Sequence, residues 1–317
     1  MKQNFLGSTD LKVSVAGFGV LPMGPSQLAL GIDVGAAILK HAIERGINFV
    51  DTAQYYKTYP YIKRALQMGA ERPIICSKSL ARDYAGMMDA IKEARDELEL
   101  EVIDIFLMHE VRSGGLEERS GAWQALVDAK KQGLVKAIGL STHHVDITEE
   151  AAYMDELDVV FPLLNYAGLG IRRGDAFATA QDMEKAILLC RSRAKGVFTM
   201  KAFGGGNLTS NYRRALDYAF GVEGVDSVMI GFGSIGEVDD LFAYLNGEMS
   251  QDYNPDVSQK RVYISQDDCE GCGACKSACP AGAIFYNENG LADVDREKCL
   301  TCGYCAPVCP VRAVIMY

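Results

Sequence analysis

Eight of the ten cysteines in this chain form two closely spaced runs near its end. The runs read CEGCGACKSACP and CLTCGYCAPVCP, and each follows the pattern C-x2-C-x2-C-x3-C-P. Thiolates at this spacing bind two [4Fe–4S] clusters, and the fourth cysteine of each run ligates the cluster of the other run. The sequence therefore predicts two ligand sets, which are Cys269, Cys272, Cys275 and Cys309 for one cluster, and Cys279, Cys299, Cys302 and Cys305 for the other.

Other uses of these cysteines fit the pattern less well. A zinc site needs four ligands rather than eight, and it needs no proline after the fourth cysteine. A disulfide framework is disfavoured under the reducing conditions of the cytosol. Two roles for the clusters stay open, because two clusters in one module form an electron path and because metal binding can also supply most of a small module's folding free energy.

A second group of residues that could take part in catalysis lies at regular intervals earlier in the chain. The residues that each end a short apolar segment are Asp51, Lys78, His109 and Ser141, and Tyr56 follows soon after the first of them in DTAQYY. A tyrosine can donate a proton to a carbonyl oxygen, and a histidine can orient that oxygen. Taken singly, each residue has a structural explanation as a helix cap, a solvated strand end or a buried polar group. Their common position at successive strand ends favours one shared site.

The apolar segments before these residues belong to a longer alternation of strands and helices. Candidate strands are 15–19, 47–51, 73–78, 103–109, 134–141, 158–165, 196–201 and 226–231. Helical patterns lie near 33–45, 59–68, 84–99, 120–132, 147–156, 182–194, 211–220 and 235–246. Eight strand–helix units predict an α/β fold, a (β/α)8 TIM barrel with its site at the carboxyl ends of the strands. An open doubly wound sheet is the alternative, and the lack of G-x-G-x-x-G before the first helix counts against a Rossmann fold.

The predicted organisation has three parts. Residues 1–247 form the barrel domain, which begins with a short hairpin over 1–14. Residues 248–260 form a linker, and residues 261–317 form a small α+β ferredoxin-like domain that holds both clusters.

Four stretches carry a family resemblance. DTAQYY, the strand end at Lys78, DIFLMH ending at His109 and GLVKAIGLS ending at Ser141 resemble the aldo-keto reductase family. The resemblance covers roughly residues 5–247. Residues 261–317 resemble a bacterial-type ferredoxin, so the whole chain resembles the iron–sulfur-containing branch of that family.

The resemblance implies an oxidoreductase that transfers hydride between a nicotinamide coenzyme, NAD(H) or NADP(H), and a carbonyl or alcohol substrate. It implies four catalytic residues, Asp51, Tyr56, Lys78 and His109. Tyr56 would donate the proton, and we expect the Lys78 ammonium to lower its pKa. Asp51 would hold Lys78 in place, and His109 would orient the carbonyl oxygen.

The coenzyme contacts match the family less closely. The residues in coenzyme-binding positions are Ser141, Thr142, Asn165, Met200, Lys201, Gly231, Gly233 and Ser234. The loop GFGSIGEVDD lacks the basic residue that reads a 2′-phosphate and carries Glu237, which favours NADH over NADPH. The alternative function is a ferredoxin-type electron-transfer protein whose barrel reduces its substrate without nicotinamide, for example through a flavin.

Overall composition sets limits on partners and location. The chain has 317 residues and a net charge of −10, which disfavours nucleic-acid binding because phosphates require a basic patch. No apolar run reaches the roughly 18–20 residues of a membrane helix, and the first residues lack a signal-peptide core. We therefore expect a cytoplasmic protein that meets a small carbonyl or alcohol substrate and, through its clusters, a redox protein partner.

Overall fold

The computed structural model describes residues 1–255, 261–300, 303–306, 308–311 and 313–316. Their contacts divide the chain into two compact units. The larger unit comprises Met1–Ala202 and Asp217–Met249, and the smaller comprises Phe203–Leu216 and Ser250–Tyr317.

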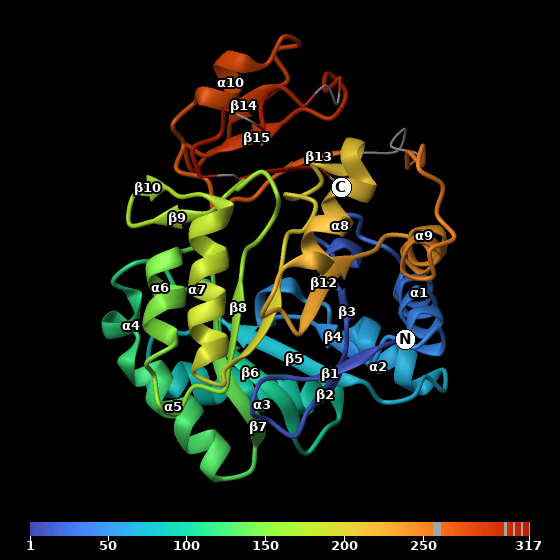
Figure 1. The fold of residues 1–317 in the computed structure, drawn as a ribbon. Helices are drawn as coiled ribbons and strands as arrows, with labels where there is room; N and C mark the ends of the chain where they lie inside the picture. The colour runs from blue at the N-terminus through green and yellow to red at the C-terminus, as the bar shows by residue number, and fades with distance from the viewer. Residues whose placement is uncertain (256–260, 301–302, 307, 312, 317) are drawn as a thin grey trace. The chain divides into compact units, whose positions relative to one another are not determined.

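The larger unit contains a closed barrel of parallel strands (Figure 1). The strands are β3 (Ala16–Gly19), β4 (Phe49–Asp51), β5 (Ile74–Ser79), β6 (Ile103–Met108), β7 (Val135–Thr142), β8 (Val159–Pro162), β11 (Gly196–Thr199) and β12 (Ser227–Gly231). They pair in chain order, and β12 closes the barrel by pairing with β3. The predicted (β/α)8 barrel is confirmed, and the doubly wound sheet is excluded because that sheet does not close.

Helices follow the strands and lie around the barrel. They are α1 (Ile32–Glu44), α2 (Tyr59–Gln67), α3 (Tyr84–Leu98), α4 (Gly115–Glu118), α5 (Ser120–Lys131), α6 (Val145–Ala151), α7 (Ala180–Ser192), α8 (Tyr212–Gly221) and α9 (Ile235–Leu245). Side-chain caps start three of them, from Asp83, Thr179 and Ser234. A capped first turn satisfies backbone N–H groups that would otherwise lack partners. A short hairpin, β9 (Arg172–Arg173) and β10 (Ala176–Phe177), lies between β8 and α7.

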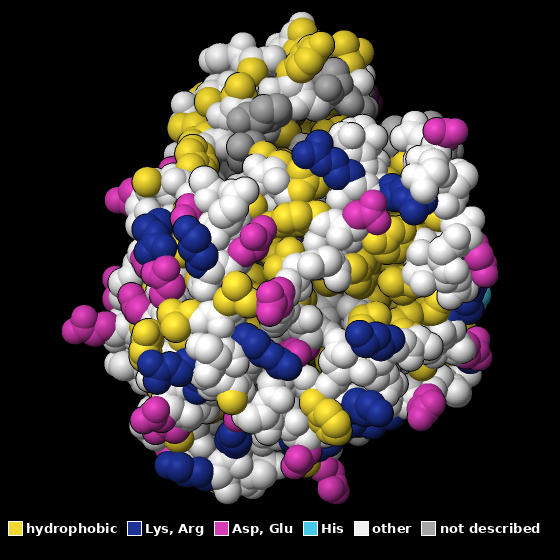
Figure 2. Space-filling view, viewed as in Figure 1, with side chains coloured by type: hydrophobic (Ala, Val, Ile, Leu, Met, Phe, Trp, Pro, Cys, Tyr) yellow, Lys and Arg dark blue, Asp and Glu magenta, His cyan; other side chains and the backbone are white. Residues whose placement is uncertain are grey.

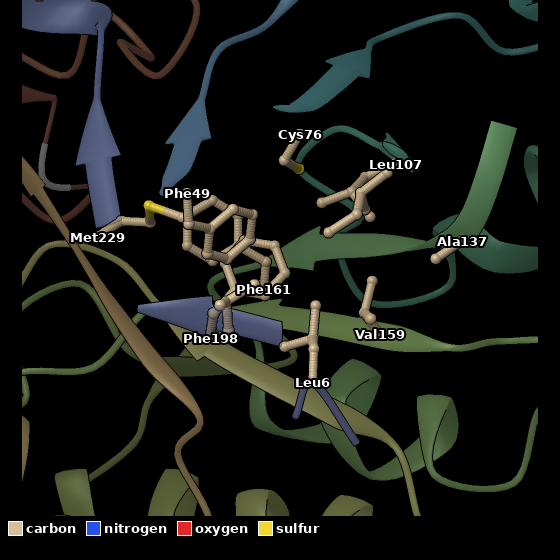
Figure 3. Close-up of a cluster of buried hydrophobic side chains, with 11 residues drawn as sticks. Leu6, Phe49, Cys76, Leu107, Ala137, Val159, Phe161, Phe198 and Met229 are labelled. Carbon is tan, nitrogen blue, oxygen red and sulfur yellow. The ribbon is translucent and has the colours of Figure 1, made fainter. Parts of the chain in front are cut away.

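The barrel core is filled by large apolar side chains from opposite strands (Figure 3). Phe161 and Phe198 stack with their ring centroids 4.2 Å apart, and Phe49 meets Phe198 edge-on at 5.0 Å. The hairpin of β1 (Gln3–Phe5) and β2 (Lys12–Ser14) adds Leu6 and Val13 to the same cluster. Burial of this continuous apolar surface is the main stabilising contribution to the barrel.

The smaller unit carries both cysteine runs. Its elements are β13 (Val262–Ile264), α10 (Ala274–Ala278), β14 (Ile284–Tyr286), β15 (Ala292–Val294) and β16 (Val314–Met316). Two antiparallel pairs form, β13 with β16 and β14 with β15. The α+β character predicted for this part of the chain is therefore confirmed.

One segment differs from the predicted division of the chain. Residues 203–216, which the prediction placed within the barrel domain, belong by their contacts to the smaller unit. Met316 donates its backbone N–H to the Gly205 carbonyl at 2.9 Å. Gly206 has a φ of 83°, and a Cβ there would lie 1.6 Å from the Met316 oxygen, so only glycine allows this approach. Residues 256–260 of the predicted linker lie outside the described residues.

Candidate active site

The four residues predicted to act together do lie together at the carboxyl ends of neighbouring strands. Asp51 ends β4, Lys78 lies near the end of β5, and His109 directly follows β6. Tyr56 ends a short 3-10 helix, η2 (Gln54–Tyr56), in the loop after β4. The Tyr56 hydroxyl lies 3.3 Å from His109 Nε2, and Lys78 Nζ lies 4.7 Å from the centre of the Tyr56 ring.

Hydrogen bonds from β5 hold the Tyr56 loop. Ser79 Oγ donates to Gln54 Oε1 at 2.7 Å, and Tyr59 Oη lies 2.7 Å from Ser77 Oγ. These contacts fix both ends of the turn that presents Tyr56. The sequence produces this arrangement because serine hydroxyls alternate along β5 and reach neighbouring loops.

Three residues beside the site have a left-handed backbone although none is glycine. They are Lys57 after Tyr56, with φ 55°, Glu110 after His109, with φ 51°, and Lys201 at the end of β11, with φ 60°. Such conformations cost free energy and are retained where the surrounding structure fixes them, which is common at functional sites. Here each one turns the chain away directly after a strand end or the Tyr56 turn.

Lys78 and Asp51 form a buried ion pair. The Lys78 ammonium donates to both Asp51 carboxylate oxygens, at 2.8 and 2.9 Å, and to the Thr52 carbonyl at 2.7 Å. Burial alone would lower the pKa of Lys78, but the nearby Asp51 carboxylate, together with Tyr56 and Cys76, outweighs burial and holds that pKa above its ordinary value. Burial raises the pKa of Asp51, and the Lys78 ammonium opposes that rise. Lys78 is thus held as a cation beside the Tyr56 ring.

The pKa of Tyr56 moves in the direction opposite to the one expected from the sequence. Burial raises it to about 12, which outweighs the lowering by the Lys78 cation, and the Asp51 and Glu110 carboxylates add to the rise. The expectation of a net lowering was wrong because burial of a hydroxyl cannot be read from the types of its neighbours. Tyr56 therefore keeps its proton through the neutral range.

His109 is held neutral. Burial, together with the cations Lys78, Arg119 and Lys201, lowers its pKa well below the ordinary value. Its Nδ1 is buried and has no hydrogen-bond partner among the described residues. Arg119 fixes the surrounding loops by donating to the carbonyls of Ala81, His109 and Ser79. Sequence reasoning did not identify Arg119, because an arginine in a polar loop gives no signal of burial.

The predicted coenzyme-binding residues near the fifth and sixth strands are partly engaged with the protein itself. Ser141 Oγ accepts the Glu110 N–H at 2.9 Å, and its own hydroxyl proton has no acceptor among the described residues. Thr142 Oγ1 donates to the Val111 carbonyl at 2.6 Å and accepts from the His144 N–H. The Asn165 amide bonds both backbone groups of Leu169, at 2.9 and 3.0 Å, and so closes its own loop.

The loop after β12 holds a carboxylate of its own. Ser234 caps α9, and the Glu237 carboxylate accepts the N–H of Gly233 at 2.7 Å. Gly231 ends β12 in the same loop. Ser-x-x-Glu is the sequence pattern of a capping box, but the Glu237 carboxylate bonds the N–H of Gly233, one residue before the Ser234 cap, rather than the N–H of Ser234 itself. The amide that was expected to meet a coenzyme phosphate is thus already bonded.

The remaining two predicted positions lie at the end of β11. Met200 packs against the barrel core and forms a single parallel β-bridge with Leu163, which lies in the segment predicted as the sixth strand. Lys201 follows it and is half-buried. Its charge contributes to the lowered pKa of both His109 and His143, so its side chain lies on the Tyr56 side of the barrel.

The cysteines of the smaller unit approach one another as the motif predicts. Cys275 and Cys309 are buried in one cluster, and Cys269 packs against it. Burial raises the pKa of Cys275, and Cys309, Cys269 and Cys272 add to the rise. Burial likewise raises the pKa of Cys305 to about 11, with contributions from Cys299 and Cys279 of the second set and from Cys275. A cavity is lined by three cysteines of the second set, Cys279, Cys299 and Cys305. Cys302 lies outside the described residues.

The cysteine sulfurs fit iron–sulfur clusters. Backbone N–H groups donate to the sulfurs of Cys269, Cys279 and Cys309 at 3.2 to 3.4 Å, and such bonds tune the reduction potential of a bound cluster. Among the described residues no three cysteine, histidine or acidic groups lie close enough to hold a single metal ion.

Comparisons with known proteins agree with both units. A model of the aldo/keto reductase family matches residues 33–219, and a model of a 4Fe-4S dicluster domain matches residues 262–316. L-galactose dehydrogenase of Arabidopsis thaliana is 24% identical over 277 residues, which cover 75% of this chain and 86% of that protein. The uncharacterized oxidoreductase YqkF of Bacillus subtilis (strain 168) is 22% identical over 236 residues, 69% of this chain and 74% of that one.

The fold has a solved counterpart. An aldo-keto reductase of Bacillus halodurans in its holo form matches with a TM-score of 0.64 at 18% identity, covering 79% of this chain and 92% of that one. At this identity the likeness establishes the barrel fold alone. No helix in the described part of the chain combines the length and apolar character needed to cross a membrane.

Proposed function

Because the chain belongs to the aldo/keto reductase family, we propose that this oxidoreductase interconverts a carbonyl group and an alcohol at the carboxyl ends of its barrel strands. The observation that carries the proposal is the 3.3 Å approach of the Tyr56 hydroxyl to His109 Nε2, beside the buried Lys78–Asp51 pair. A proton donor, an orienting imidazole and a fixed cation are the groups that carbonyl reduction requires.

Tyr56 is the proton donor in this proposal. Its raised pKa keeps the proton in place at neutral pH, so the acid form is always available. The oxygen of a carbonyl that accepts hydride becomes an alkoxide, which is a stronger base than a phenolate and takes the Tyr56 proton. The Lys78 cation next to the ring then stabilises the phenolate that remains.

His109 orients the carbonyl oxygen. Because its pKa is lowered, the ring is neutral and carries a single N–H. The ring meets Tyr56 edge-on with centroids 5.4 Å apart, so both side chains can donate to one oxygen placed between them. Two donors aimed at the same oxygen stabilise the charge that develops there.

A nicotinamide coenzyme fits the site at its ring end. When bound, nicotinamide supplies the hydride to the carbonyl carbon. Ser141 offers an unused hydroxyl proton for the carboxamide of that ring. Met200 and Lys201 lie just past the end of β11, which β8 separates from β7 in the barrel. We propose that Ser141 and Met200 hold the ring end of NAD(H), and that Tyr56 faces the substrate.

The smaller unit is a 4Fe-4S dicluster domain. We propose that its clusters transfer electrons to or from a redox protein, with Cys269, Cys272, Cys275 and Cys309 on one cluster and the remaining four cysteines of the motif on the other. Each cluster passes one electron, whereas nicotinamide passes two as hydride. Direct exchange between the two therefore requires a converter such as a flavin.

A second candidate function is reduction of a substrate in the barrel without nicotinamide. The observation that favours it is the contact between the Glu237 carboxylate and the Gly233 N–H. Loops after the seventh and eighth strands of such barrels commonly bind phosphate. Here the second of these loops bonds an internal carboxylate, which competes with any coenzyme phosphate.

Anaerobic mixing of the reconstituted protein with NADH and then NADPH separates the two functions. Nicotinamide and cluster absorbance are recorded together, with and without a set of carbonyl compounds. Carbonyl-dependent loss of NADH with intact cluster absorbance is the result expected for the first function. Carbonyl reduction driven by a reduced one-electron donor, with neither NADH nor NADPH consumed, would replace it by the second.

A further inference from the structure

Lys201 stands out among the charged residues of the site because its ammonium has no partner among the residues that the structure describes. It follows Met200, whose carbonyl accepts the Leu164 N–H where β8 and β11 end together. No residue that the structure describes forms an ion pair or a side-chain hydrogen bond with the Lys201 ammonium. A half-buried ammonium without a partner is costly, and it is retained where a ligand supplies the missing charge.

A second group beside Lys201 is also unengaged. The His143 imidazole is half-buried and makes no side-chain hydrogen bond with a described residue. His143 directly follows β7, His109 directly follows β6 and Lys201 lies two residues beyond β11, so all three lie at the same end of one barrel, where the charges of Lys201 and His109 also act on His143. His109 Nδ1 likewise has no partner among the described residues. Three nitrogen groups with free hydrogen-bonding capacity therefore gather at the strand ends beside Tyr56.

The charges around this cluster are not balanced. The principal charged groups acting on Tyr56, His109 and His143 are two carboxylates, Asp51 and Glu110, and four cations, Lys78, Arg112, Arg119 and Lys201. The ion pairs Lys78–Asp51 and Arg112–Glu110 use both carboxylates.

The two remaining cations, Arg119 and Lys201, differ in their hydrogen bonds. Arg119 is bonded to backbone carbonyls, which leaves Lys201 as the cation that can receive an anion. The chain as a whole has a net charge of −10, and on the face drawn in Figure 2 acidic and basic side chains are interspersed. A local excess of positive charge on an acidic protein attracts anionic ligands to that place.

We propose that Lys201 and His143 form an anion subsite that binds the carboxylate of a 2-oxo acid substrate, with its carbonyl oxygen at Tyr56 and His109. The inference rests on the proposed carbonyl reduction and names its substrate class. The carbonyl carbon gains the hydride, the carbonyl oxygen gains the Tyr56 proton, and NADH is oxidised to NAD⁺. The product is a 2-hydroxy acid, and the carboxylate is unchanged.

The position of His109 decides between a substrate carboxylate and a coenzyme phosphate. The ring of His109 contacts Tyr56, so it borders the carbonyl oxygen directly. A 2-oxo acid carries its carboxylate on the carbonyl carbon itself, which fits an anion held by Lys201 and His143 at the same strand ends as His109. The phosphates of a dinucleotide are separated from its nicotinamide ring by a ribose and lie further from the reacting carbon.

The test compares pyruvate with its neutral methyl ester as substrates of the holoprotein and of Lys201→Met. Methionine keeps the length of the side chain and tolerates the same backbone, and Lys201→Arg restores the charge. Loss of one charge-assisted hydrogen bond predicts a KM for pyruvate raised about 10- to 100-fold, with the KM for the ester changed less than about threefold. Lys131→Met, an exposed substitution on α5, serves as the control.

The remaining outcomes each decide a claim. If Lys201→Met raised the KM for pyruvate and for its methyl ester equally, the subsite would be overturned. If it raised the KM for NADH and left the KM for pyruvate unchanged, the subsite would also be overturned, and Lys201 would be assigned to the coenzyme. Calorimetric binding of pyruvate to the holoprotein, weakened by Lys201→Met, supports the subsite even if no carbonyl compound is reduced, and then only the proposed function fails. If pyruvate is neither bound nor reduced while the ester is reduced, the subsite is refuted and the function stands.

Discussion

The Lys78–Asp51 pair allows a quantitative test of the site. The Lys78 side chain is 1% exposed and that of Asp51 is 8% exposed. Substituting Lys78→Met removes three hydrogen bonds, two to Asp51 and one to the Thr52 carbonyl, and leaves a buried carboxylate without its cation. Breaking a buried pair in this way costs about 3–5 kcal/mol of unfolding free energy.

The assay uses the single tryptophan of the chain. Trp123 lies on α5 of the larger unit, so its fluorescence during urea unfolding reports on the barrel, and cluster absorbance reports on the smaller unit. We expect the Trp123 transition of Lys78→Met to shift to lower urea and the cluster transition to stay in place. Carbonyl reduction should fall as well, because the phenolate of Tyr56 loses its cation.

The double variant Lys78→Met with Asp51→Asn provides the control. Asparagine removes the buried charge, so the double variant should recover about 2 kcal/mol or more of what the two single variants lose in sum. If Lys78→Met destabilised the barrel by less than about 1 kcal/mol, or if the two losses simply added, the two side chains would not form the interacting buried pair described here.

Three further predictions follow from the same geometry. Below the unfolded histidine pKa of about 6.5, the unfolded chain binds protons that His109 and His143 do not bind in the folded protein. The unfolding free energy should therefore decrease by about 1.4 kcal/mol for each of the two histidines per unit of pH lowered, until the pKa of the folded state is reached. Urea titrations of the parent protein and of His143→Gln between pH 7 and pH 5 should differ by one such slope. Cys309→Ser should alter the electron paramagnetic resonance signal of the first cluster alone, and Cys279→Ser that of the second; an effect of Cys309→Ser on the second cluster would refute the crossed pairing. Arg119→Met should lower the unfolding free energy by about 2–4 kcal/mol because buried carbonyls lose their donor, and a loss under about 0.5 kcal/mol would contradict that role.

Much of the fold was readable from the sequence because its signals are local. Six of the eight predicted strands end within one residue of the observed strands, whereas the predicted 158–165 and 196–201 run past the ends of β8 and β11. Asp51, Lys78 and His109 marked one rim of the barrel. The cysteine spacing defined the smaller unit in the same way, since three thiolates within a few residues already fix one cluster corner by corner. Each of these signals depends on neighbours in the chain.

The features that the sequence did not reveal depend on burial or on distant contacts. The raised pKa of Tyr56 comes from desolvation, which the residues around it in the sequence do not express. The assignment of residues 203–216 to the smaller unit depends on Met316, more than a hundred positions away. That Lys201 has no partner among the described residues depends on everything that surrounds it in space.

The central claim is that Tyr56 gives its proton to a carbonyl oxygen. Its most direct test is the rate of carbonyl-dependent NADH oxidation by Tyr56→Phe, measured anaerobically with cluster absorbance followed in the same cuvette. Phenylalanine keeps the ring beside Lys78 and removes only the hydroxyl. Because the variant lacks its proton donor, we expect a kcat lowered about 10²- to 10⁴-fold, with unchanged clusters and an unchanged KM for NADH. A Tyr56→Phe protein that reduces carbonyl compounds within about threefold of the parent rate would contradict it.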